Sequence, residues 1–96
     1  MSERTRRGDT LNRPANIWEF YELLHVIERR LDETGESEWA NRLRDAVLGG
    51  ATSGEILDRV GVELRHLDDT EIPARSGVAS ELLIADQFIT EASGSP

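Results

Sequence analysis

The chain has 96 residues, no cysteine and a formal net charge of −8 at pH 7. This length supports one domain with a modest core, and the lack of cysteine excludes disulfides and thiolate chemistry. No apolar run approaches the roughly 18 residues of a membrane helix, and no apolar stretch follows the basic N-terminus as in a secretory signal. We therefore expect a soluble cytoplasmic protein without a membrane partner.

The charge is distributed unevenly along the chain. Residues 1–13 hold four arginines and two acids, whereas residues 14–96 hold seven arginines and 17 acids. An acidic body repels nucleic-acid phosphates, so we expect no nucleic-acid partner. Such a surface promotes solubility, and binding of a basic partner or mimicry of nucleic acid remains a sharper alternative.

Local signals divide the chain into a helical domain between two tails. Residues 1–13 are polar and without periodicity, which predicts a flexible N-terminal tail, and residues 93–96 are predicted to be a disordered C-terminal tail. Within the single domain at 14–92, Pro14, Asn16 and Glu19 are start signals for a helix over residues 16–34. Gly35 stands where a left-handed residue would end that helix.

The segment 37–67 predicts a helical hairpin. Ser37 is expected as the N-cap of the second helix, and Gly49-Gly50 ends it. Thr52 and Glu55 form a capping-box pattern: the Thr52 hydroxyl should accept from the Glu55 amide, and the Glu55 carboxylate should accept from the Thr52 amide. The third helix then extends to Leu67 and contains Gly61, which either permits the close approach of a neighbouring helix or has no structural role.

The remainder predicts a loop followed by a last helix. Residues 68–77 contain Ile72-Pro73, which argues against a helix through this stretch. The helix over residues 78–92 carries Leu83 and Ile84 outside its apolar stripe, so it is either buried on two sides or presents a surface to a partner. The expected fold is all-α, an irregular bundle of four short helices with a central helical hairpin. Its expected core contains Ile17, Phe20, Leu24, Ile27, Leu31, Trp39, Leu43, Val47, Ile56, Val60, Leu64 and Leu67.

The run from Trp39 to Leu57, WANRLRDAVLGGATSGEIL, carries a family resemblance. It resembles small uncharacterised bacterial all-α proteins with a GGATxxEIL-type helical hairpin. The resemblance implies a bacterial origin and an all-α fold, and it supplies no activity and no functional residues.

Two Glu-x-x-His motifs raise the question of a metal site. Glu22 and His25 stand on the first helix, and Glu63 and His66 on the third. Carboxylate di-metal bundles use two such motifs because positions i and i+3 share one face. Here Glu22 lies nearly opposite the apolar stripe of the first helix, and His66 lies well off the apolar stripe of the third. These ligands would therefore not converge in a bundle interior. We expect no metal and no other cofactor.

Other chemistries are also disfavoured. The segment from Gly49 to Ile56 keeps the outer glycines of a phosphate-binding loop, but Glu55 replaces the lysine that would reach the phosphates. The third helix has a mixed, mildly acidic outer face, unlike a DNA-recognition helix. No serine stands at a local spacing from either histidine that indicates nucleophilic catalysis.

The sequence therefore favours a small acidic non-enzymatic protein-binding module, such as a regulator, an adaptor or an immunity-type inhibitor of unidentified partner. Trp18 lies at the edge of its helical stripe, and with Leu83 and Ile84 it is the candidate partner-binding surface, because interface hot spots favour Trp. One alternative is a metal-binding or catalytic bundle that uses the Glu-x-x-His motifs. Another is a structural domain that self-associates as a homodimer.

Overall fold

The computed structural model describes residues 14–92, and these residues form helices without any strand. The bounds are α1 Ile17–Glu33, α2 Ser37–Leu48, α3 Ser53–Asp68, α4 Ile72–Ser76 and α5 Ala79–Ala92. The predicted all-α class is confirmed, but this part of the chain has five helices where the sequence predicted four. The stretches predicted as tails, 1–13 and 93–96, lie outside the described residues.

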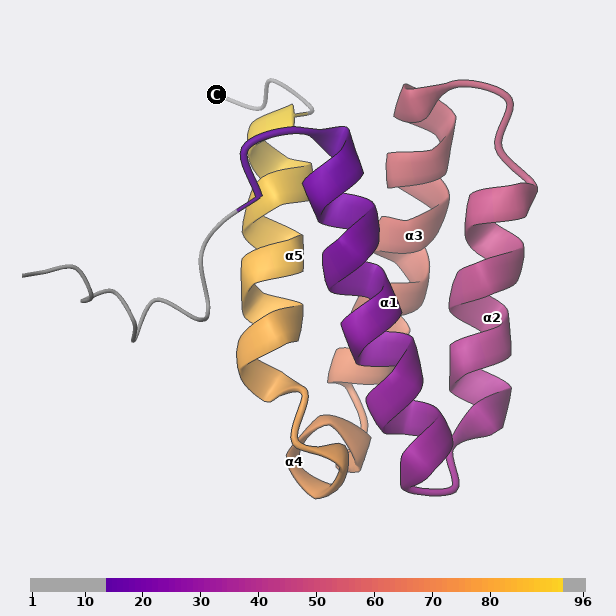
Figure 1. The fold of residues 1–96 in the computed structure, drawn as a ribbon, viewed down its shortest axis with the longest axis vertical. Helices are drawn as coiled ribbons and strands as arrows, with labels where there is room; N and C mark the ends of the chain where they lie inside the picture. The colour runs from indigo at the N-terminus through magenta and orange to yellow at the C-terminus, as the bar shows by residue number, and fades with distance from the viewer. Residues whose placement is uncertain (1–13, 93–96) are drawn as a thin grey trace, which may run out of the picture.

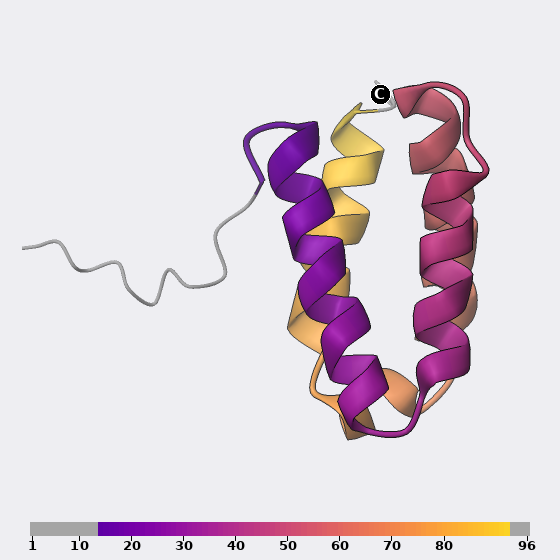
Figure 2. The same ribbon diagram turned by 45° about the vertical axis from the view of Figure 1, so that its right-hand side comes forward.

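The four longer helices run alternately down and up, and α4 closes the lower end between α3 and α5 (Figure 1). Helices α1 and α3 each pack against both α2 and α5. Figures 1 and 2 show α1 and α2 close together at their connecting loop and separating toward their other ends. None of the helices in residues 14–92 combines the length and apolar content needed to cross a membrane.

The ends of α1 follow the predicted local signals. The Asn16 side chain accepts a hydrogen bond from the Glu19 amide at 3.0 Å, which satisfies one of the free donors of the first turn. At the other end Gly35 has φ of +86°, and the Glu36 amide donates to the Leu31 carbonyl at 2.7 Å. This is the left-handed termination that glycine permits at low cost.

One of the two hydrogen bonds predicted for the capping box of α3 is present. Thr52 Oγ1 accepts from the Glu55 amide at 3.2 Å, as expected. The Glu55 carboxylate, however, accepts from the amide of Ala51 at 2.8 Å and not from that of Thr52. Glu19 reaches the Ala15 amide in the same way at the start of α1. In both helices the carboxylate satisfies the amide one position before the N-cap.

The start of α2 differs from the prediction. Ser37 is its first helical residue, and Glu36 occupies the N-cap position without a side-chain hydrogen bond to the helix. Ser37 instead contributes a hydrogen bond that, after the larger effect of Arg44, lowers the pKa of Asp32. The sequence therefore placed the N-cap of α2 one residue too late.

Helix α4 corrects the predicted loop. Pro73 lies in the first turn of α4, where a missing amide hydrogen is tolerated, so the proline begins a helix here. Thr70 Oγ1 accepts from the Ile72 amide at 3.1 Å ahead of this turn. Gly77, with φ of +73°, ends it. The short helix lets Ile72 and Pro73 turn inward and close the lower end of the core.

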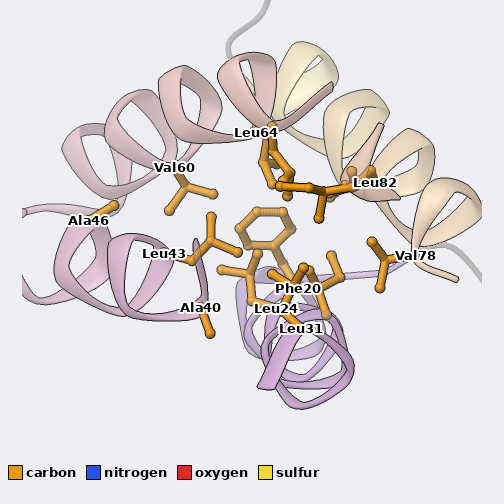
Figure 3. Close-up of a cluster of buried hydrophobic side chains, with 14 of the residues drawn as sticks. Phe20, Leu24, Leu31, Ala40, Leu43, Ala46, Val60, Leu64, Val78 and Leu82 are labelled. Atoms are coloured by element: carbon orange, nitrogen blue, oxygen red, sulfur yellow. The ribbon is translucent and has the colours of Figure 1, made fainter. Parts of the chain in front are cut away.

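The core lies between all four long helices (Figure 3). Phe20 is fully buried at its centre, and its ring stacks on Phe88 with centroids 4.8 Å apart. Eight of the twelve expected core residues are buried. The other four are partly buried and pack against the core: Ile17, Trp39, Val47 and Ile56.

Side-chain contacts hold the lower end of α1 to the segment around α4. Arg30 Nη1 donates to the Gly77 carbonyl at 2.8 Å and to Glu81 Oε2 at 2.9 Å. The Glu81 side chain is nearly buried, so this contact satisfies a carboxylate withdrawn from water. The hydroxyls of Thr34 and Ser76 also meet at 2.7 Å. The lower end is closed by these contacts, whereas α1 and α2 separate above it.

Candidate functional site

A groove of about 630 Å³ lies between α1 and α2. Its apolar wall is formed by Tyr21, Leu24, Val47 and Leu48. Leu48 is the last residue of α2 and is 81% exposed. The volume lies in the range of ordinary ligand and peptide sites.

Trp18 borders this groove. Its ring meets that of Tyr21 edge to face, with centroids 5.9 Å apart, and it remains 71% exposed. At 100° per residue, Trp18 lies about 40° from Asp32 around α1 and about 120° from Arg30. Asp32 contacts α2 and Arg30 contacts α5. Trp18 therefore faces the α2 side of α1.

The other end of the groove is charged and held together by Arg44 of α2. Arg44 Nη2 lies 2.6 Å from Asp32 Oδ2, and Arg44 Nε lies 3.3 Å from Glu28 Oε1. The hydrogen bond from Arg44 lowers the pKa of Asp32, and the same contact raises the pKa of Arg44. A third donor of the guanidinium reaches Asn41 Oδ1 at 2.9 Å. This network fixes the separation of α1 and α2 at the charged end.

Glu28 is the buried member of that network. The residue is 4% exposed, and its Oε1 also lies 3.4 Å from His25 Nδ1. A carboxylate at this depth needs a cationic or donor neighbour, which Arg44 supplies. The His25 side chain itself is 73% exposed, so the histidine stands at the rim of the groove.

The structure separates the three residues predicted for partner binding. Trp18 borders the α1–α2 groove, whereas Leu83, 60% exposed, and Ile84 belong to α5. Ile84 is partly covered and lines a small hollow with Pro14 and Phe88. The predicted surface is therefore divided between α1 and α5.

The four Glu-x-x-His residues do not converge. Glu22, His25 and His66 are exposed, and Glu63 is bound by Arg42 of α2 at 2.8 Å. Within residues 14–92, no three His, Asp or Glu side chains are arranged to hold a metal ion.

Sequence reasoning missed most of the groove. Leu48 carried a usable signal, because it stands about 140° from Leu43 around α2 and so lies off the apolar stripe. Glu28 and Arg44 carried none, because their pairing depends on how α1 and α2 pack, and the same packing decides that Arg29 lines the groove. Comparison with models of protein families, with curated proteins and with solved structures gave no match to this chain.

Proposed function

We propose that this chain is a small non-enzymatic protein-binding module whose partner occupies the α1–α2 groove. The observation that carries the proposal is an apolar groove flanked by two large, exposed side chains, Trp18 and Leu48. Contiguous exposed apolar surface on a small protein marks interaction sites, and truncation of a buried interface Trp is among the most costly changes in complexes. Such a module would act as a regulator, an adaptor or an immunity-type inhibitor.

The chemistry of the groove favours binding over nucleophilic catalysis. Its lining residues include no serine or threonine, and the chain has no cysteine. Its acids Glu28 and Asp32 are engaged by Arg44, so neither is poised as a free general base. An apolar wall beside a charged end whose groups are paired with one another suits a surface that a partner covers.

Photo-crosslinking in the cells that produce the protein tests this function. A photoreactive amino acid replaces Leu48 in one variant and Leu83 in the other, so that two exposed leucines on different faces are compared. We expect one crosslinked protein from position 48 and none from position 83. Equal products from both positions would refute a groove-specific partner. A product consisting only of a second copy of the chain would replace this proposal by the homodimer alternative.

A further inference from the structure

The net charge of −8 suggests a basic partner, but the groove itself indicates the opposite. Its two acids, Glu28 and Asp32, are both engaged by Arg44, at 3.3 and 2.6 Å. A cationic partner residue would have to compete with a guanidinium that is already in place. A charged side chain of the groove that has no partner of its own would therefore indicate which charge the groove favours in a binding partner.

Among the charged side chains that line the groove, Arg29 is the one without a charged partner in residues 14–92. Its side chain lines the groove and is exposed, and it has no ion pair or hydrogen bond to any of residues 14–92. Arg29 stands eleven positions after Trp18, about 20° away around α1 and about 16 Å along it. The α1 edge of the groove therefore carries an exposed aromatic ring at one end and an unpaired cation at the other.

From these positions, and on the basis of the proposed function, we infer that the groove receives an amphipathic helix of the partner with an acidic residue that pairs with Arg29. The apolar residues of that helix lie against Tyr21, Leu48 and the ring of Trp18. The groove lies between the two helices α1 and α2, and helices that bind in such grooves present apolar anchors at i, i+3, i+4 and i+7. If the first apolar anchor of the partner helix lies beside Trp18, a side chain three turns further along that helix lies opposite Arg29.

Two synthetic helical peptides test the inference. They share one row of leucines and differ in one flanking position, three turns from the first leucine, which is Glu in one and Lys in the other. Binding is measured by fluorescence anisotropy of the labelled peptides at about 0.15 M salt, where the Debye length is about 8 Å. For each protein variant we compare the ratio of the two dissociation constants. The acidic protein attracts the Lys peptide at long range, and this attraction affects the ratio equally in variants of equal net charge.

Arg29→Glu should weaken the Glu peptide relative to the Lys peptide by roughly fivefold, because one attraction is lost and one repulsion is created at an exposed site. Arg65→Glu makes the same change of net charge on the exposed surface of α3 and should leave the ratio within about twofold. Equal effects of the two variants would overturn the inference, because the preference would then follow net charge alone.

Leu48→Ser should weaken both peptides by roughly tenfold through lost apolar burial, whereas Leu83→Ser should weaken neither. Equal losses from both serine variants would place the peptides outside the groove and overturn the inference. Failure of both peptides to bind wild type would also overturn it. A crosslink from position 48 would still support the proposed function in that case, so the two proposals fail separately.

Discussion

Replacement of Asp86 by Asn should stabilise the protein near neutral pH and have little effect in acid. Asp86 on α5 lies within hydrogen-bonding reach of Asp68, the last residue of α3. Burial, then the hydrogen bond and repulsion from Asp68, raise the pKa of Asp86 to about 6, and Arg65 partly offsets them. Two carboxylates that share a site favour the state in which one is protonated.

The sign and size of the effect follow from this pKa. Between pH 3.8 and about 6 the folded protein holds a proton on Asp86 that the unfolded chain has lost. The contribution of this group to the free energy of unfolding is therefore fully present below pH 3.8 and is lost as pH rises through about 6. The pKa difference corresponds to about 3 kcal/mol. Solvent screening of a partly exposed carboxyl reduces the expected gain of Asp86→Asn at neutral pH to about 1 kcal/mol.

Urea denaturation followed by far-ultraviolet circular dichroism at about pH 4, 6 and 7.5 measures the effect. The gain of Asp86→Asn over wild type should be near zero at the lowest pH and should develop fully by the highest. Asp58→Asn, which removes one charge from the exposed surface of α3, is the control for the change in net charge. A gain that is equal at all three pH values, or shared by Asp58→Asn, would refute the raised pKa of Asp86.

Two further predictions concern stability, measured by the same denaturation at neutral pH. Arg30→Ala should lower the free energy of unfolding by about 2 kcal/mol, because it leaves the buried carboxylate of Glu81 without its partner. Arg75→Ala removes an exposed ion pair and should cost about 0.5 kcal/mol, and equal losses would show that burial of Glu81 is unimportant. Gly61→Ala should stabilise α3 by about 0.5–1 kcal/mol, because a Cβ there would lie 3.6 Å from Ile89, an ordinary contact. A loss of stability in Gly61→Ala would show that α3 and α5 are too close for a methyl group.

Most helix boundaries could be predicted because their signals are local. Asn16 and Thr52 each accept from an amide three residues later, and Gly35 supplies the positive φ that ends α1. Helix α4 could not be placed in this way. A proline either ends one helix or begins the next, and at Pro73 the choice depends on the burial of Ile72 beneath α5 and α3.

The candidate site was predicted only in part. Trp18 was expected at the edge of its stripe, and it is exposed. The sequence grouped it with Leu83 and Ile84, because periodicity gives the face of a residue within its own helix and not the helix that this face approaches. The packing of α1 against α2 places Trp18 beside the groove that contains Leu48.

By itself the sequence determined the all-α class, the extents of the long helices and most of the core. These features depend on apolar spacing and on caps within four residues, and such interactions form wherever the segment lies. Only the tertiary structure decided the groove and its charges. The contacts of Arg44 with Glu28 and of Arg30 with Glu81 join residues on different helices. Such pairs have no sequence period, because the direction and separation of the packed helices select them.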